Sequence, residues 1–198
     1  RQSASCGNGV YKSVDGGESF EHVGLEGTEH IGKIVVHPGQ PERVYVAASG
    51  ALWHSSEERG VFRTLDGGHR WEKVLFIDND TGVTTLAMDP QNPAVLYAAA
   101  YQRRRKPWGF NGGGPGSGLY KTTDGGDHWR RLDDGLPEGD LGRIGVAIYR
   151  GDSRILYALI EHATEAGLYR TTNRGAHWEK VNELNPRPMY YSKIFIDP

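Results

Sequence analysis

Carboxylate, arginine and aromatic residues gather in a stretch that reads SGALWHSSEERG. It contains Trp53, Glu57, Glu58 and Arg59. A glycoside hydrolase needs two carboxyl groups about 5–10 Å apart, one to donate a proton and one to act as base or nucleophile. Neighbouring glutamates on an extended chain point in opposite directions, however. The stretch therefore indicates weak catalytic candidates, and the alternative is a pair of solvated surface carboxylates.

A second stretch, YQRRRKPWGFNGGGPGSG, is the longest segment that we expect to form a loop. Its Arg103, Arg104 and Arg105 precede Trp108. Guanidinium groups beside aromatic rings suit carboxylated or sulfated sugars, acidic peptides or phosphates. The alternative is a charged, solvated loop whose aromatic rings pack on a neighbouring part of the fold. No Lys-Ser/Thr pair comes directly after the last glycine of the run, so it does not indicate a nucleotide site.

Shorter connections add weaker candidates. Asp78 in FIDNDTG and Asp140 in LPEGDLG join the possible catalytic acids. His30 in EHIGKI and Arg143 in LGRIGV occupy equivalent places just before strands that we expect to line a central channel. The segment NPRPMYY supplies one more arginine and a tyrosine. We therefore predict ligand-binding roles for the set His30, Trp53, Arg59, Arg103, Arg104, Arg105, Trp108, Arg143, Arg187 and Tyr190.

Composition argues against several other classes of protein. A net charge of −2 does not provide the broad basic face that nucleic-acid binding needs. The eight histidines lack ligand spacing and Cys6 is the one cysteine, so we predict no metal, no cofactor and no disulfide. No window of about 18 apolar residues occurs, which predicts that no helix spans a membrane. The chain starts at Arg1 without a signal-like segment, and we expect its natural N-terminus to lie further upstream.

A twelve-residue motif occurs four times and defines the framework that must position these residues. Its copies are GVYKSVDGGESF, GVFRTLDGGHRW, GLYKTTDGGDHW and GLYRTTNRGAHW. They recur roughly every 50 residues, a spacing typical of propeller blades. A second element, read as IVVHPGQPERVYVA, LAMDPQNPAVLYAA and VAIYRGDSRILYAL, alternates with the first. The spacing between its copies changes in parallel with the spacing of the first element. One unit is therefore copied along the chain.

Each unit predicts four short antiparallel strands, because apolar residues alternate or cluster over short runs that end at turn-forming residues. The sequence thus predicts an all-β fold, a β-propeller of four-stranded blades, as a partial ring of about three full blades plus parts of two others. We expect half a blade in 1–25, blades in 26–76, 77–133 and 134–183, and the first strand of a further blade in 184–198. An open ring leaves strand edges unpaired, so the remaining blades of a longer chain or a second copy would close it.

The repeated motif is predicted to be structural. Its hydroxyl and carboxylate can bond the backbone of their own turn, its glycines allow the positive φ of a tight hairpin, and its aromatic residue can pack between blades. Recurrence in every blade argues against catalysis. The positions are Ser13, Asp15, Gly17, Phe20, Thr64, Asp66, Gly68, Trp71, Thr122, Asp124, Gly126, Trp129, Thr171, Asn173, Gly175 and Trp178. In a propeller these turns lie on one face, so we expect ligands on the opposite face, among the variable loops.

The motif S/T-x-D-G-G-x-x-W, preceded by G-V/L-Y/F-K/R, resembles the Asp-box (BNR) repeat. With the D-P-x-x-P-x-x-x-Y-x-A element it looks most similar to the bacterial sortilin-like and glycosyl-hydrolase-like (xyloglucanase-type) propellers. The fourth copy departs from the pattern, with Asn173 and Arg174 in place of Asp and Gly.

The resemblance implies three functions, of which we favour the first: an extracellular or periplasmic module that binds a protein, peptide or carbohydrate. The second is a glycoside hydrolase or lyase. A sialidase version would need three arginines, for which Arg59, Arg143 and Arg187 are candidates, but no F-R-I-P-like segment is present. The third is an assembly scaffold.

Overall fold

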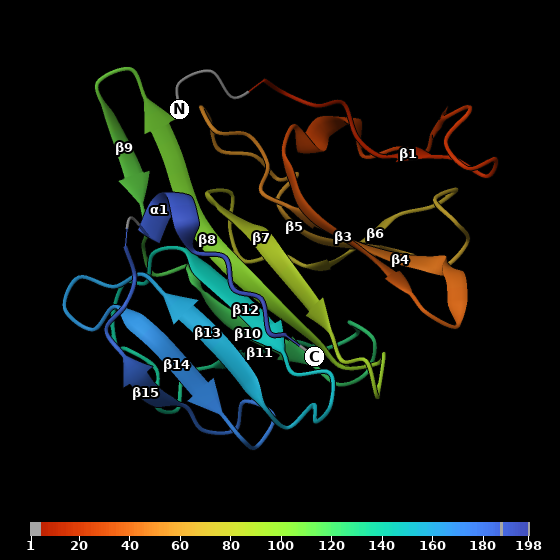
Figure 1. Cartoon of the computed structure of the whole chain (residues 1–198). Helices are drawn as coiled ribbons and strands as arrows, with labels where there is room; N and C mark the ends of the chain where they lie inside the picture. Colours follow the sequence, from red (N-terminus) through yellow and green to blue (C-terminus); the bar gives the residue numbers. More distant parts are fainter. Residues whose placement is uncertain (1–4, 187, 198) are drawn as a thin grey trace.

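The computed structural model describes residues 5–186 and 188–197, which form a series of antiparallel β-sheets (Figure 1). The sheets run β1-β2, then β3-β4-β5-β6, then β7-β8-β10-β11 with β9 paired to β8, then β12-β13-β14-β15. Each four-stranded sheet follows chain order, as the blades of a propeller do. The predicted all-β, partial-ring fold is confirmed, whereas the residue numbers at which one blade gives way to the next stay a prediction.

The strands are β1 Tyr11–Lys12, β2 Glu21–His22, β3 Ile31–His37, β4 Gln40–Ala48, β5 Gly60–Thr64, β6 Glu72–Leu75, β7 Thr81–Met88, β8 Leu96–Lys106, β9 Gly109–Gly112, β10 Gly118–Thr122, β11 Arg130–Leu132, β12 Ile144–Ile148, β13 Leu156–Ile160, β14 Gly167–Thr171 and β15 Glu179–Asn182. Two short helices accompany them, the 3₁₀ turn η1 Glu26–Thr28 and the helix α1 Pro188–Tyr191.

The second strand of the central sheet, β8, is buried on both faces over its first six residues. In β8, Tyr97 and Ala99 belong to the core shared with β12 and β13, whereas Leu96 and Ala98 belong to the core shared with β4 and β5. Side chains alternate between the two faces of a strand, so a strand between two neighbours must be apolar at every position. This is why the second repeated element reads as an unbroken apolar run.

The inner strands approach one another closely at two glycines. A Cβ on Gly32 would lie 2.5 Å from the Thr84 carbonyl oxygen, and a Cβ on Gly145 would lie 2.5 Å from the Ser192 carbonyl oxygen. Gly32 is in β3 and Thr84 in β7. Ser192 therefore lies beside β12 in the way that β7 lies beside β3.

The segment that we predicted as a further first strand differs in detail. Within 184–198, residues Pro188–Tyr191 form α1, and 192–197 carry no strand assignment. A strand assignment requires hydrogen bonds to a partner strand. The strand beside this segment, β12, forms its ladder with β13 instead.

The Asp-box turns form as the sequence suggests. Thr64 Oγ1 accepts hydrogen bonds from the backbone N–H of Asp66 (3.3 Å) and Gly68 (3.0 Å) and donates to Asp66 Oδ1 (2.8 Å). The same carboxylate oxygen accepts from Arg70 N–H at 2.9 Å. Asn173 makes the equivalent bonds in the fourth copy, because its amide oxygen accepts from His177 N–H at 2.9 Å.

The second, third and fourth Asp boxes are also bonded to the sheet before them. A basic residue in one sheet donates to a carbonyl of the next box: Lys12 Nζ to Gly67 O (3.3 Å), Arg63 Nη1 to Gly125 O (2.6 Å) and Lys121 Nζ to Arg174 O (2.7 Å). Tyrosine hydroxyls reach the same carbonyls, Tyr45 to Gly125 O at 2.8 Å and Tyr97 to Arg174 O at 3.0 Å. The two repeated elements are therefore in direct contact across neighbouring sheets.

The aromatic residue of the motif packs against the preceding sheet where this chain has one. Trp71 Nε1 donates to Val23 O at 2.6 Å, and Trp178 is 1% exposed within the core that contains Leu132. Phe20 differs, since 63% of it is exposed. No sheet of this chain precedes β1 among the described residues, so Phe20 lacks the surface on which its counterparts pack, and its predicted packing between blades is not seen.

The hydroxyl of the motif should determine stability. Thr122 is 1% exposed and bonds two backbone N–H groups. Thr122→Ala would leave these donors without a partner, so we expect a loss of about 2 kcal/mol in the free energy of unfolding, measured by urea denaturation. Thr122→Ser keeps the hydroxyl, as Ser13 does in the first copy, and should stay within about 1 kcal/mol of the parent. Equal losses in both variants would show that the hydroxyl network is unimportant.

The acid of the motif should make stability depend on pH. Hydrogen bonds from His128 N–H and the Thr122 hydroxyl lower the pKa of Asp124 below its ordinary value. A lowered pKa stabilises the fold above the unfolded-state pKa of about 4, and this contribution is lost as pH falls through the folded-state pKa. Asp124→Asn keeps an acceptor at every pH, as Asn173 does. We expect the melting temperature of the parent, relative to this variant, to fall between about pH 5 and pH 2. Parallel pH profiles would contradict this.

Candidate functional site

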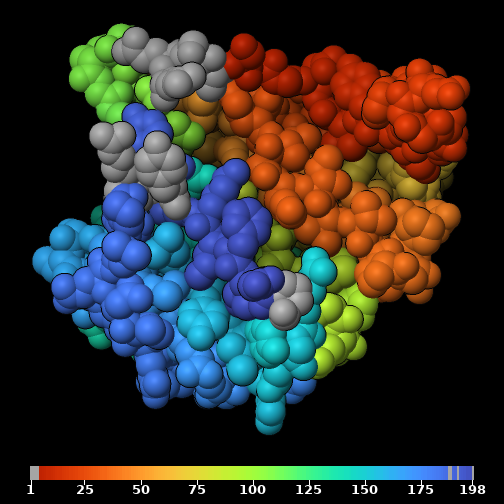
Figure 2. All heavy atoms as spheres, in the orientation of Figure 1, coloured from red at the N-terminus to blue at the C-terminus, as the bar shows by residue number. Residues whose placement is uncertain are grey.

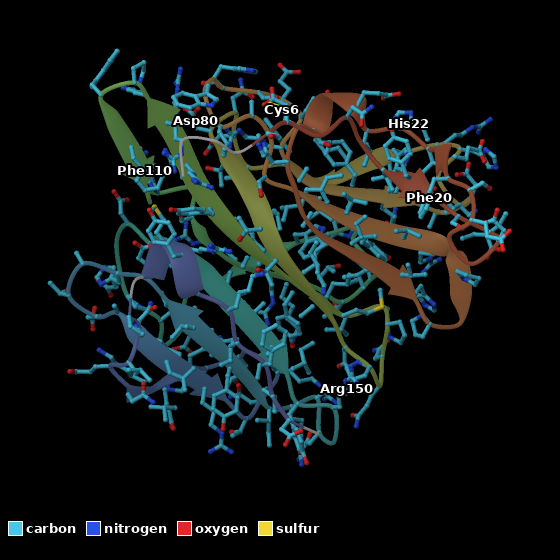
Figure 3. All side chains as sticks on the ribbon, turned by 45° about the horizontal axis from the view of Figure 1, so that its top comes forward. Cys6, Phe20, His22, Asp80, Phe110 and Arg150 are labelled. Atoms are coloured by element: carbon cyan, nitrogen blue, oxygen red, sulfur yellow. The ribbon has the colours of Figure 1, made fainter. Side chains whose placement is uncertain are left out.

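The described residues have two distinct faces. On one, which we name the turn face, the last three Asp boxes bond the hairpin formed by the first two strands of their sheets: Gly67 N–H to Glu42 O (2.9 Å), Gly125 N–H to Ala94 O (2.8 Å) and Arg174 N–H to Arg154 O (3.0 Å). On the other, the loop face, the longer connections bond one another: Ser56 N–H to Asn79 O (2.8 Å) and Gly114 N–H to Leu141 O (3.1 Å). In Figure 3, Phe20 of the turn face lies on the far side of the molecule from Phe110 of the loop face.

The arginine run lies on a strand rather than in the loop that we expected. β8 continues to Lys106 and pairs with β9, with Arg103 opposite Gly112 and Lys106 opposite Gly109. On the opposite edge, Arg103 N–H bonds Asp80 O (3.1 Å) and Arg105 N–H bonds Leu52 O (2.7 Å). Backbone hydrogen bonds on both edges therefore stabilise this end of β8 as a strand, although its residues show no apolar alternation. The β8–β9 hairpin projects from the loop face, at the upper left of Figures 1 and 2.

Strand alternation divides the arginines between two neighbours. Tyr97 and Ala99 face the β12–β15 sheet, and the same alternation carries Tyr101, Arg103 and Arg105 to that side. Arg104 points the other way. Its Nη1 donates to Ser55 Oγ at 3.1 Å and lies 3.7 Å from Asp80 Oδ1.

We name Arg103, Arg105 and Arg143, with Tyr101, the arginine cluster. The guanidinium carbons of Arg103 and Arg105 lie 5.4 and 5.5 Å from the centre of the Phe110 ring, which Figure 3 labels beside α1. Arg143 Nη1 donates to Met189 O of α1 at 2.7 Å. In residues 5–186 and 188–197, the Nε atoms of all three arginines and the Tyr101 hydroxyl are buried without a hydrogen-bond partner.

Burial and nearby charges shift the ionisation of this cluster. Burial, with a further contribution from Glu161, raises the pKa of Tyr101 to about 12, so its hydroxyl stays protonated at neutral pH. Burial also lowers the pKa of Arg103, and the charges of Arg105 and Arg143 act in the same direction. Arginine keeps its charge even so. The cluster is therefore a group of cations and one hydroxyl donor.

Tyr101 and Glu161 were not among the predicted site residues. Tyr101 is the continuation of a buried strand, and the alternation of β8 could have placed it with Arg103. Glu161 Oε2 accepts a hydrogen bond from Arg143 N–H at 2.8 Å. No motif marks Glu161, since it follows β13 in an ordinary polar connection.

Arg59 has a structural position and is a correction to the predicted ligand set. It is 1% exposed, and its guanidinium donates to the carbonyls of Ser49 (2.9 Å), Ala51 and His54 (3.3 Å). Three carbonyls of one loop thus converge on one buried fork. Arg59 therefore shapes the 49–59 loop and offers no free donor on the surface.

The other predicted residues lie on the loop face in different environments. His30 Nδ1 lies 3.1 Å from Gly50 O and 3.9 Å from Glu29 Oε2. Trp53 and Tyr190 are 43% and 54% exposed, and Trp108 at the tip of the β8–β9 hairpin is 83% exposed. Arg187 lies outside the described residues.

The four candidate acids differ in their environments. Glu57, Glu58 and Asp140 are exposed. Asp78 is half-buried and accepts from Asp80 N–H (2.7 Å) and Thr81 Oγ1 (2.9 Å), so its carboxylate closes its own turn. Their roles stay predictions.

Two absences hold for the residues that the structure describes. No group of three or more His, Cys, Asp and Glu side chains there is placed to hold a metal ion. The helices among them, η1 and α1, have three and four residues, and neither meets the length and apolar character needed to cross a membrane.

Comparisons with known proteins agree with the fold. The sequence is 30% identical over 158 residues to a probable oligoxyloglucan-reducing end-specific xyloglucanase of Neosartorya fischeri, covering 77% of this chain and 17% of that protein. The structure resembles an ancestral GH74 enzyme (TM-score 0.67, 20% identity, 90% of this chain and 22% of that one). It also resembles the GH74 xyloglucanase of Xanthomonas campestris (TM-score 0.66, 20% identity, 88% and 27%).

The chain spans between 17% and 27% of the length of these relatives. A family model described as sortilin, neurotensin receptor 3, matches residues 8–138, which is more than half of the chain. This chain therefore belongs to the Sortilin-Vps10 family of propeller proteins.

Proposed function

We propose that this chain is a carbohydrate-binding propeller module that contacts a polysaccharide with its loop face. The observation that carries the proposal is Trp108, which is 83% exposed on a hairpin anchored by backbone bonds on both edges. A large exposed aromatic ring on a rigid element favours binding, because it buries much apolar area at little entropic cost. The apolar C–H face of a sugar ring stacks on such a surface.

A second aromatic side chain lies in the adjoining loop. Trp53 directly follows Leu52, whose carbonyl accepts the hydrogen bond from Arg105 N–H. Trp53 and Trp108 therefore belong to neighbouring segments of one face. The relation to a probable xyloglucanase favours a polysaccharide ligand over a peptide. A polysaccharide is too large and too polar to cross a lipid bilayer, so we place the protein outside the cytoplasm, extracellularly or in the periplasm.

The ring is proposed to be completed by further blades of a longer chain, with a second copy as the alternative. Phe20 of the first, two-stranded sheet is exposed, and no sheet precedes that one among the described residues. An apolar surface of this kind is covered in a closed propeller by the neighbouring blade.

Trp108→Ala should weaken binding of xyloglucan oligosaccharides by about tenfold or more, because central tryptophans dominate binding free energy. Isothermal titration calorimetry measures the change. Phe20→Ala is the matched control, since Phe20 is an exposed aromatic residue of the turn face. It should leave the affinity unchanged. An affinity that survives Trp108→Ala, or that falls equally in Phe20→Ala, would refute the proposed face.

A second candidate function, glycoside hydrolysis, is favoured by the name of the 30% identical relative. Its candidate acids are Glu57, Glu58, Asp78 and Asp140. If one of them is the proton donor or base, its amide variant should lower the release of reducing ends from xyloglucan by at least about a hundredfold. Four variants that retain the parent rate would eliminate this set.

A further inference from the structure

Building on the proposed function, we propose that the arginine cluster binds the carboxylate of an acidic sugar, so that the preferred polysaccharide carries uronic acid groups. The inference names the ligand class of the loop face, which the comparisons leave open. It follows from the charge, the hydrogen-bonding capacity and the rigidity of Arg103, Arg105 and Arg143.

The charge of the cluster is not balanced. Three guanidinium groups accompany one carboxylate, that of Glu161, which accepts a bond from the Arg143 backbone. None of the three arginines forms an ion pair within the part of the chain that the structure describes. The neighbouring Arg104 does, with Asp80. Like charges held together in a partly buried place repel, and a bound anion relieves that repulsion.

The unused donors are of the kind that a carboxylate accepts. The Nε atoms of Arg103 and Arg105 and the hydroxyl of Tyr101, which is 3% exposed, are buried without a hydrogen-bond partner among the described residues. Guanidinium presents a planar fork that matches a carboxylate, and such charge-assisted bonds are about twice as strong as neutral ones. The protonated tyrosine adds a second kind of donor. Buried polar groups usually have a hydrogen-bond partner, and a bound carboxylate would supply one here.

The arginines are held in place before a ligand arrives. Arg103 and Arg105 both lie against the Phe110 ring, at 5.4 and 5.5 Å, and Phe110 belongs to β9 of the same hairpin. Arg143 is fixed by its bond to Met189 O. Ordered side chains lose little conformational entropy on binding, which raises affinity.

An acidic sugar fits this hairpin better than other anions do. Trp108, Arg103 and Arg105 are carried by one β8–β9 hairpin, so one ligand can offer a ring to the tryptophan and a carboxylate to the guanidinium groups. A free phosphate ion has no ring to stack. An acidic peptide remains the main competitor and is tested below.

The test compares two oligosaccharides that differ only in charge. One is a xylo-oligosaccharide with a single glucuronic acid branch, and the other is the same oligosaccharide without the branch. Titration calorimetry of the 198-residue chain at low salt should show at least about tenfold tighter binding of the acidic ligand, with the gain falling at high salt. Arg103→Gln and, separately, Arg105→Gln should remove this gain.

Arg104→Gln is the matched control, because Arg104 lies on the same strand and points to the other side. It should preserve the gain. Equal binding of the two oligosaccharides would overturn the inference and leave the proposed function intact, whereas binding of neither would overturn both. Loss of the gain in Arg104→Gln would reduce the effect to general surface charge and overturn the inference. Tighter binding of an acidic peptide than of the acidic oligosaccharide would also overturn it.

Discussion

A hydrogen bond between neighbouring sheets determines the order of this fold. A lysine or arginine of one sheet donates to the carbonyl at the centre of the next Asp box, as Arg63 does to Gly125 and Lys121 does to Arg174. That carbonyl is available because the threonine hydroxyl and the acid of the box hold the turn open by bonding its N–H groups. The box thus stabilises its own hairpin and also bonds the sheet before it. Repetition of this contact sets successive sheets side by side.

Fixing the turns on one face leaves the other face free to vary. The Asp boxes occupy their hydroxyl, carboxylate and carbonyl groups in structural bonds, so they have little left for a ligand. The loop face has no repeated hydrogen-bonded turn motif of this kind among the described residues. Its connections differ in length, and β8 extends past its sheet to form a hairpin with β9. The exposed Trp108, Arg103 and Arg105 all lie on this hairpin, which is why the proposed chemistry is placed there.

The architecture could be predicted from the sequence because its structural unit is repeated along the chain. Four copies of a turn motif and a second element in step with it predicted the strands, the turn chemistry and the partial ring. The hydrogen bond from Tyr97 to the fourth box joins the two repeated elements, which accounts for the parallel changes in their spacing along the chain. Even the altered fourth copy forms its turn, since Asn173 supplies the same acceptor and Arg174 adopts a positive φ of 59°.

The candidate site was harder to predict, because its residues occur once and no repeated pattern marks them. The run RRRK lacks the apolar alternation that marks a strand, so we expected a loop, and the structure has β8. Its alternation then separates Arg104 from Arg103 and Arg105, which sequence alone grouped together. Arg59 looked like a ligand residue but binds three carbonyls of its own loop. Contacts between blades, such as Arg143 beside Tyr101 and Glu161, depend on packing that no local pattern encodes.

We assign a structural role to the turn face and ligand binding to the loop face. Hydrogen exchange with and without a bound xyloglucan oligosaccharide tests this assignment most directly. Amides of 101–112 and of the 49–59 loop should exchange more slowly in the complex, while those of 64–71 and 122–129 should keep their rates. Slower exchange confined to the Asp-box turns would mean that ligand meets the face that we assign to structure, and the account would be wrong.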